Sequence, residues 1–281
     1  MRYMITAGLA VFMAAGTLIS CSDTNEPAVE GTGTLRMILV DAPPDIGEVD
    51  SLIVVFDEVL VHRGCESEEE CDGEWVTVLS DTLPVEDRTF DLLELVNGVF
   101  AVLGEVELDA ALYSQVRIMY ESATLYIGGE PQDLFIPSGN QTGIKLVNAF
   151  EVDPNVITEL IVDFDVAESL HEAPPGSGNY ILRPTIRLVE NVLSGTISGT
   201  VTPVGIGAVV YALDPATADT VTSTMPDPDT GGYVLQALLA GTYDVMAAAE
   251  GYVDSTRTGI TVDAGANTPG IDFDLVPVAV E

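Results

Sequence analysis

Apolar and polar residues alternate along most of the chain beyond residue 33, which is the period-two pattern of strands with one buried face. In the first such segment Leu35, Met37 and Leu39 would point to the same side, and Pro43 and Pro44 would end the strand. No long segment repeats apolar residues at the three- to four-residue spacing of an amphipathic helix. The pattern therefore predicts an all-β protein.

Up to residue 190 the alternation is divided into short segments by turn residues. After the first strand, the predicted strands are 49–62, 75–79, 115–122, 124–127, 143–152, 157–166 and 180–190. The segment 49–62 changes phase near Asp57 and Glu58, which indicates a β-bulge. The segment 90–108 is ambiguous and has room for one short helix. Short strands at this spacing favour a β-rich sandwich domain over residues 33–190.

The composition changes near residues 191–194, after which small residues, Gly and Thr predominate. The strands predicted there are 196–202, 208–213, 220–225, 233–237, 242–248, 256–262 and 271–276. Seven strands in about 80 residues match the size of one small β-sandwich. We therefore expect two β-sandwich domains in tandem, the second over residues 194–276.

The N-terminal segment has the features of a secretory signal peptide. Arg2 precedes an apolar run over residues 5–19, which is too short to cross ~30 Å of hydrocarbon. The run ends in Leu18-Ile19-Ser20-Cys21, which resembles the bacterial lipobox, whose cysteine receives a lipid. The alternative is an ordinary signal peptide with an incidental cysteine. We expect a lipoprotein signal peptide over 1–20, lipidation of Cys21 and a flexible tether over 21–32.

A lipid on Cys21 would anchor the chain to a membrane without a transmembrane span, because each buried methylene contributes ~0.8 kcal/mol. The rest of the chain would then lie outside the cytoplasm, in the cell envelope. By resemblance to Gram-negative lipoproteins, Ser22 after the cysteine favours the outer membrane. The sequence does not distinguish between the periplasmic and the surface face of that membrane.

The chain is strongly acidic, with 9 basic and 45 acidic side chains and a formal charge of −36. Removal of residues 1–20 takes away only Arg2, which leaves 8 basic side chains and a charge of −37. Such a surface repels phosphates, so we expect no nucleic acid partner and no binding to anionic headgroups. The acidity would serve solubility, as in a salty habitat, or attract divalent cations or a basic partner.

Three cysteines are present, and lipidation of Cys21 would leave Cys65 and Cys71 as a pair. An even remainder in an oxidising envelope predicts a disulfide. The rival interpretation is a metal site, which two cysteines without further ligands would make poorly. The loop between them also holds the densest group of acidic residues. Its calcium candidates are Glu68, Glu69, Glu70 and Asp72, although a solvated loop tip fits better because the spacing of a calcium loop is missing.

Candidate catalytic residues are few. His62 and His171 are the only histidines, and Ser169 with His171 is the nearest approach to a nucleophile and base. No Gly-x-Ser-x-Gly sequence surrounds that serine. Trp75 is the only tryptophan, so the sequence shows no aromatic platform for a glycan. We expect both histidines to be ordinary surface residues.

Asp163 and Asp165 flank Phe164 on a predicted strand and would share one face. Neighbours at this spacing lie near the ~5–9 Å separation of glycosidase carboxylates, so a carboxylate-dependent hydrolase is one hypothesis. The segment 272–274 repeats Asp-Phe-Asp, with its aspartates expected on the wet face. The repetition favours ordinary sandwich patterning over an active site.

The second predicted domain resembles the carboxypeptidase regulatory-like family. The matching segments are Gly195–Val201, Gly232-Tyr233, Leu239–Val245 and Glu250–Tyr252. The resemblance implies a transthyretin-like, Ig-like sandwich that serves as an accessory module without a catalytic site. It also implies that Tyr243 packs and hydrogen-bonds across a corner of the sandwich.

The first predicted domain resembles an uncharacterised family of bacterial lipoproteins, the domain of unknown function forty-three eighty-two. The matching segments are Gly33–Leu35, Leu39–Pro43, Val54–Val59, Phe90–Leu95, Tyr113–Arg117, Gly143–Leu146, Asp163–Val166 with Ser169, and Tyr180–Pro184. The resemblance implies an extracytoplasmic β domain and no established activity. In addition, residues 108–116 echo residues 239–245, which suggests the same kind of tyrosine corner in both domains.

Together these features predict a membrane-anchored envelope lipoprotein with a non-enzymatic binding, structural or adhesion role. Its partner would be a protein or a glycan, and no cofactor is expected. The alternatives are a calcium-dependent adhesion or glycan-binding module and, less favoured, the hydrolase.

Overall fold

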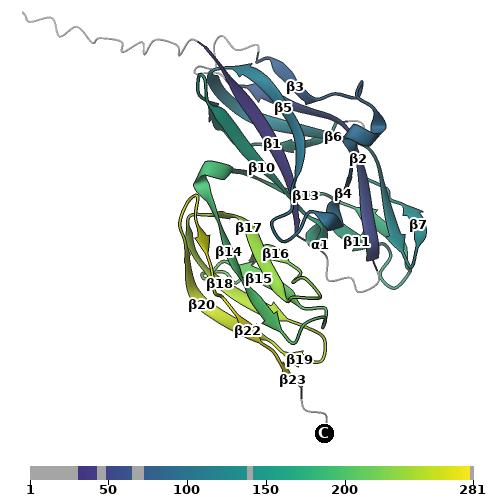
Figure 1. Cartoon of the computed structure of the whole chain (residues 1–281). Helices are drawn as coiled ribbons and strands as arrows, with labels where there is room; N and C mark the ends of the chain where they lie inside the picture. The colour runs from purple at the N-terminus through teal and green to yellow at the C-terminus, as the bar shows by residue number, and fades with distance from the viewer. Residues whose placement is uncertain (1–30, 43–48, 65–72, 138–141, 279–281) are drawn as a thin grey trace, which may run out of the picture.

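The computed structural model describes residues 31–42, 49–64, 73–137 and 142–278 (Figure 1). These residues form mostly β-strands, joined by short 3-10 helices and one single-turn α-helix. The predicted all-β sandwich-like class is confirmed. Within the described part of the chain, no helix is long and apolar enough to cross a membrane.

Residues 32–190 form one set of strands and short helices, which we call the first unit. Its strands are β1 (Thr32–Ala42), β2 (Val49–Arg63), β3 (Trp75–Leu79), β4 (Thr89–Asp91), β5 (Ala101–Asp109), β6 (Ala111–Ile127), β7 (Glu130–Asp133), β8 (Ile144–Leu146), β9 (Phe150–Val152), β10 (Ile157–Asp165), β11 (Leu170–Glu172), β12 (Tyr180–Leu182) and β13 (Thr185–Glu190). Its helices are η1 (Val85–Arg88), η2 (Leu92–Glu94) and α1 (Val166–Ser169).

Two sheets of the first unit face each other. One has the order β13-β10-β1-β5, in which β1 and β10 are parallel and the other pairs are antiparallel. The other has the order β3-β2-β6-β7, with β4 on β2 and with β8 and β9 on β6. Leu35, Met37 and Leu39 share one buried face of β1, as predicted, and lie in the core of this unit. The alternation in the sequence thus produces the core.

Several predicted boundaries needed correction. β6 is one continuous strand of 17 residues, where the sequence predicted two. The predicted strand 143–152 is instead two short strands, β8 and β9, which pair with different parts of β6. The predicted strand 157–166 ends at Asp165, because Val166 begins α1. The predicted bulge in β2 is confirmed, since the pairing with β6 shifts between Phe56 and Glu58.

The second unit covers residues 194–277 and follows a short helix, η3 (Asn191–Leu193). Its strands are β14 (Ser194–Thr202), β15 (Val209–Leu213), β16 (Thr220–Thr224), β17 (Gly232–Leu239), β18 (Gly241–Ala248), β19 (Tyr252–Val253), β20 (Ser255–Val262), β21 (Asn267–Thr268), β22 (Phe273–Asp274) and β23 (Val276–Pro277). One sheet has the order β17-β14-β21, with β22 on β14, and the other has the order β16-β15-β18-β20. The short strands β19 and β21 were not predicted, and the predicted strand 271–276 is divided between β22 and β23.

A tyrosine corner is present in each unit. The hydroxyl of Tyr113 donates to the carbonyl of Asp109 at 3.1 Å, and the hydroxyl of Tyr243 donates to the carbonyl of Leu239 at 2.8 Å. In both cases the acceptor lies four residues before the tyrosine, as in the corners of Ig-like sandwiches. The predicted hydrogen bond of Tyr243 and the predicted equivalence of the two corners are therefore confirmed.

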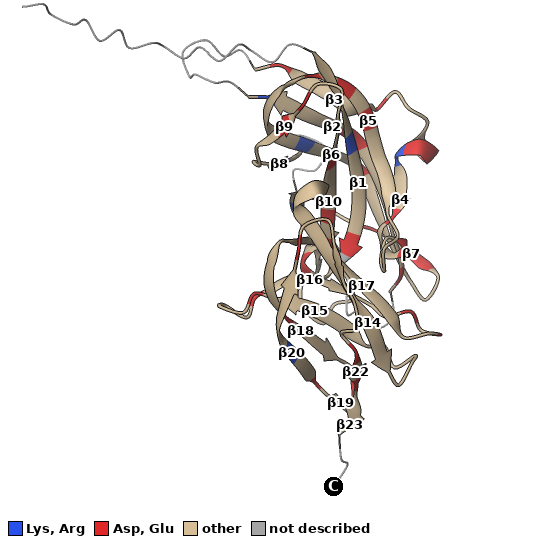
Figure 2. Ribbon diagram, turned by 60° about the vertical axis from the view of Figure 1, so that its left-hand side comes forward, with Lys and Arg blue, Asp and Glu red and all other residues tan. Residues whose placement is uncertain are grey.

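The two units meet at the outer face of the first unit's β13-β10-β1-β5 sheet. Ala237 of β17 packs there in a small apolar cluster with Ile38, Val40, Ile161 and Val189. β1 also contacts β16, and Figures 1 and 2 both show the second unit against the ends of β1 and β10. One face of β10 is consequently buried by the first unit's core and the other by the second unit.

A single asparagine connects the units by hydrogen bonds. The side-chain amide of Asn97 donates to the carbonyl of Met225 at 2.6 Å, and its oxygen accepts from Thr224 Oγ1 at 3.0 Å and from the amide of Val234 at 3.3 Å. Asn97 has a φ of 56°, which asparagine tolerates better than most residues. This backbone conformation positions the side chain that holds β16 and β17.

Candidate functional site

Several predicted site residues lie outside the described residues. They are Cys21, Cys65, Cys71, Glu68, Glu69, Glu70 and Asp72. Lipidation, the disulfide and the calcium loop therefore stay predictions. Among the residues that the structure does describe, no group of three or more histidine, cysteine, aspartate or glutamate side chains could hold a metal ion.

Asp163 is almost completely buried, with 2% of its surface exposed. It lies on β10 opposite Arg187 of β13, whose Nη2 donates to the Asp163 carboxylate in a short ion pair. Burial raises the pKa of Asp163 to about 6, and the positive charge of Arg187 opposes this rise. The charge of Arg187 also opposes the rise that burial causes in the pKa of Tyr243, a residue of the second unit. The ion pair thus belongs to the junction between the units.

Asp165 is also buried, and its carboxylate has a structural role. Its Oδ1 accepts from the amide of Glu168 at 2.9 Å and so caps the N-terminus of α1. Burial raises the pKa of Asp165, and the hydrogen bond from the Glu168 backbone opposes the rise. Asp163 and Asp165 thus share one face of the strand, as predicted, but that face is buried. The strand is covered on both sides, and its outward-facing aspartates meet the second unit or a helix terminus.

This arrangement does not suit hydrolysis of a glycan. A glycosidase needs two carboxylates that both reach the scissile bond and a water molecule. Here Asp163 is held in an ion pair and Asp165 in a helix cap, and both are buried. A cavity of about 920 Å³ does lie beside the junction, but its lining includes Ile161 and neither aspartate.

Ser169 and His171 do not form a nucleophile and base. Ser169 is fully buried, and its hydroxyl donates to the Asp165 carbonyl and accepts from the Thr185 amide at 2.8 Å. His171 follows on β11 with an exposed side chain, as the sequence predicted. The hydroxyl is thus engaged with the backbone and joins the end of α1 to β13.

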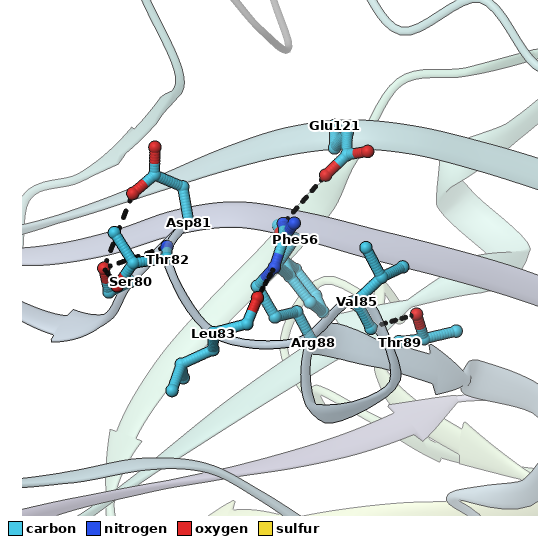
Figure 3. A network of polar contacts seen from close by, with 9 residues as sticks. All are labelled: Phe56, Ser80, Asp81, Thr82, Leu83, Val85, Arg88, Thr89 and Glu121. Carbon is cyan, nitrogen blue, oxygen red and sulfur yellow. Dashed lines mark hydrogen bonds and ion pairs between the residues drawn. The ribbon is translucent and has the colours of Figure 1, made fainter.

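Arg88 is a buried arginine that the sequence did not single out (Figure 3). Its Nη1 donates to the carbonyl of Phe56 at 2.6 Å and pairs with Glu121 at 2.8 Å, while its Nε donates to the carbonyl of Leu83 at 3.2 Å. Phe56 lies at the bulge in β2, where the ladder with β6 is interrupted. Arg88 therefore attaches the η1 loop to the bulge and is engaged within the protein.

A group of basic and aromatic side chains lies on the outer surface of the β3-β2-β6-β8 part of the second sheet. We call it the basic–aromatic face, and it consists of Trp75, His62, Arg117 and Lys145. The guanidinium of Arg117 lies 4.1 Å from the centre of the Trp75 ring, and the ring of His62 lies 4.8 Å from it. Lys145 is directly opposite Arg117 in the β6–β8 ladder. Figure 2 shows basic positions on β6 and beside β8.

His62 differs from the expectation of an ordinary surface histidine. It is half-buried at the end of β2, and its Nδ1 lies 3.3 Å from the hydroxyl of Ser114. Its ring is tilted by 56° against that of Trp75, so the tryptophan is partly covered by both His62 and Arg117. The sequence signal for this group was limited to the single lysine and the single tryptophan, because only the strand pairing brings them together.

The fold is a β-sandwich-like arrangement with tyrosine corners, and the first unit carries a family signature. The chain belongs to the family described as Domain of unknown function (DUF4382), whose model matches residues 32–184. The predicted resemblance of the first domain is thereby confirmed. The resemblance of the second region to carboxypeptidase regulatory-like domains stays a prediction. A search of curated proteins found no significant match.

Three solved structures share weak similarity with the chain. The Bacillus anthracis TIE protein is 13% identical with a TM-score of 0.25, and the match covers 88% of this chain and 34% of that chain. The minor pilin GBS52 of Streptococcus agalactiae is 10% identical with a TM-score of 0.23, covering 88% and 97%. A double mutant of the shaft pilin SpaA of Lactobacillus rhamnosus GG is 9% identical with a TM-score of 0.22, covering 90% and 99%. The chain thus spans about a third of the TIE protein, and likenesses this weak identify no shared function.

Proposed function

We propose that the protein is a lipid-anchored, non-enzymatic binding protein of the cell envelope. The observation that carries the proposal is the burial of Asp163 and Asp165, the two carboxylates whose spacing most resembles that of a glycosidase. Both are buried in structural contacts of the fold. The basic–aromatic face is instead a group of side chains that combines positive charge with an aromatic ring, which suits binding of a ligand.

The anchor in this proposal is the lipid on Cys21, supported by the lipobox-like Leu18-Ile19-Ser20-Cys21. Residues 22–30 would link it to β1, which begins at Thr32. In this arrangement both units stand outside the cytoplasm, on the outer membrane. A binding role fits such an attached protein, because the anchor keeps it at the surface where its partner is encountered.

The anchor is tested by expressing the full chain and the Cys21→Ala variant in a Gram-negative host. We expect the unaltered chain in the membrane fraction and labelled by a radioactive fatty acid, and the variant unlabelled and released from the membrane. Cys65→Ala is the matched control, since it removes a cysteine without touching the anchor and should stay labelled. Membrane retention of the Cys21→Ala variant would contradict the anchor.

The absence of catalysis is tested with a panel of polysaccharides and the purified protein lacking residues 1–21. We expect no release of reducing ends above that of a heat-denatured sample. Hydrolysis that disappears in the Asp163→Asn variant, with the fold retained by circular dichroism, would overturn the non-enzymatic assignment.

A further inference from the structure

We propose that the basic–aromatic face binds a glycan that carries carboxylate groups, such as a uronic acid polymer. This inference rests on the proposed binding function and gives it a site and a ligand class. The side chains concerned are Arg117 and Lys145, with Trp75 and His62 as the aromatic support.

The first argument is the placement of two positive charges side by side. Arg117 and Lys145 form a direct cross-strand pair between β6 and β8. Like charges at this position destabilise a sheet, because the side chains project to the same face. Gly143 brings the strands together closely, since a Cβ there would lie 2.8 Å from the Ile118 carbonyl oxygen. The fold thus holds the two cations together.

The second argument is that no carboxylate of the described residues forms an ion pair with either of them. Four other basic residues in the described part of the chain form ion pairs, namely Arg36, Arg63, Arg88 and Arg187. Arg117 and Lys145 form none with a described residue, although the chain has 45 acidic side chains. The Nε of Arg117 is buried without a hydrogen-bond partner among the same residues. Since neither side chain has an ion-pair partner among these residues, their two charges can attract an external anion, although the buried Nε itself would not contact it.

The third argument concerns preorganisation. The guanidinium of Arg117 lies over the Trp75 ring at 4.1 Å, and the ring of His62 also contacts Trp75, with 4.8 Å between ring centres. A stacked guanidinium keeps a fixed plane, and its remaining donors can engage a carboxylate through two hydrogen bonds. Trp75 acts here as a positioning residue, while Arg117 and Lys145 would contact the ligand.

The overall charge of the chain decides which anion fits. A net charge of −36 repels a ligand with dense negative charge, such as nucleic acid. A uronic acid polymer has one carboxylate on each sugar, and the apolar faces of its rings suit aromatic and aliphatic surroundings. This charge density is lower than that of duplex nucleic acid, and the apolar ring faces suit a partly covered tryptophan beside two cations.

The test is isothermal titration of the purified protein lacking residues 1–21 with oligogalacturonate at low ionic strength. We expect binding that weakens with added salt and is lost when the carboxyls are methyl-esterified. Arg117→Gln and Lys145→Gln should each weaken binding about tenfold or more, as expected for loss of a charge-assisted contact. Lys145 is exposed, so its variant tests the proposal even if Arg117→Gln disturbs the fold.

Arg183→Gln is the matched control, because Arg183 is an exposed arginine of the same unit whose described contact is made by its backbone amide. It should bind as the unaltered protein does. Three results would overturn the carboxylate assignment. They are absence of binding, equal binding of the methyl ester or of a sulfated neutral glycan, and unchanged binding by both glutamine variants. If the protein does not bind oligogalacturonate but its membrane location still depends on Cys21, the glycan site is refuted and the lipid anchor is not. The two proposals can therefore be refuted separately.

Discussion

The tripeptide Asp-Phe-Asp occurs at residues 163–165 in β10 and at residues 272–274 around β22, and the two copies have opposite surroundings. Both phenylalanines are buried, with 0% of Phe164 and 2% of Phe273 exposed. In the first copy Asp163 and Asp165 are buried as well, whereas in the second the aspartates are exposed. The phenylalanine is thus buried in both copies, as alternation predicts, whereas the aspartates are exposed in the second copy and buried in the first.

The difference comes from the position of each strand in its sheet. β10 lies between β1 and β13, with the first unit's core on one side and the second unit on the other. Among the described strands β22 pairs with β14 alone, and Asp272 and Asp274 are exposed. The carboxylate of Asp272 there accepts from the amide of Thr200 at 2.8 Å and from its hydroxyl at 2.9 Å. Alternation therefore assigns a residue to a face, while the neighbouring unit decides whether that face is wet.

The two copies should differ most in how much stability is lost when the arginine beside each of them is removed. Arg187→Met leaves the Asp163 carboxylate buried without its partner, which costs about 3–5 kcal/mol when a buried pair is broken. Arg187 keeps 30% of its side chain exposed, so we expect the lower end of that range. The measurement is urea unfolding at neutral pH. Arg257→Met is the control, because Arg257 lies 5.8 Å from the Phe273 ring centre and donates to the Asp272 carbonyl in an exposed setting. An equal loss in both variants would show that the Asp163 pair is not desolvated.

The stability of the protein should also depend on pH through Asp163 in the first copy. Burial raises the pKa of Asp163 to about 6 in the folded chain, from an ordinary value of 3.8, so the folded state binds the proton more tightly. The resulting stabilisation is complete below about pH 3.8 and is lost as the pH rises to about 6. Relative to Asp163→Asn, the free energy of unfolding should fall by up to about 3 kcal/mol across this window. Urea unfolding at a series of pH values measures it, and a difference that is independent of pH would contradict the buried environment of Asp163.

The two tyrosine corners provide a smaller comparison of the units. Tyr113→Phe and Tyr243→Phe each remove one hydrogen bond to the backbone, at a cost of about 1 kcal/mol. Tyr113 is 1% exposed and stacks on Phe150 with 5.5 Å between ring centres, while Tyr243 is only half-buried. We expect the larger loss for Tyr113, measured by thermal or urea unfolding. A larger loss at Tyr243 would show that the corner of the second unit contributes more.

Loss of an exposed carboxylate in the second copy should have the smallest effect. Asp272→Ala removes the acceptor for Thr200, but water can satisfy the freed groups because Asp272 is exposed. We expect the free energy of unfolding to fall by no more than about 1 kcal/mol. A loss as large as that of Arg187→Met would contradict the contrast between the two copies.

The sequence by itself determined the all-β class, the positions of many strands and the inward side chains. Leu35, Met37 and Leu39 are buried because strict alternation is what a half-buried strand requires. The bulge near Asp57 was visible as a change of phase, and the tyrosine corners were visible as a repeated local pattern. These features depend on residues that are close in the sequence, so local patterns were sufficient to predict them.

The tertiary structure decided everything that depends on distant partners. Asp163 faces Arg187 across 24 residues, and Asn97 contacts Met225 across 128 residues. The adjacency of Trp75, Arg117 and Lys145 follows from the order β3-β2-β6-β8, which no local pattern encodes. Burial of a carboxylate and assembly of a binding face are properties of the pairing of strands and of the contact between units. A single sequence specifies them only through the complete fold.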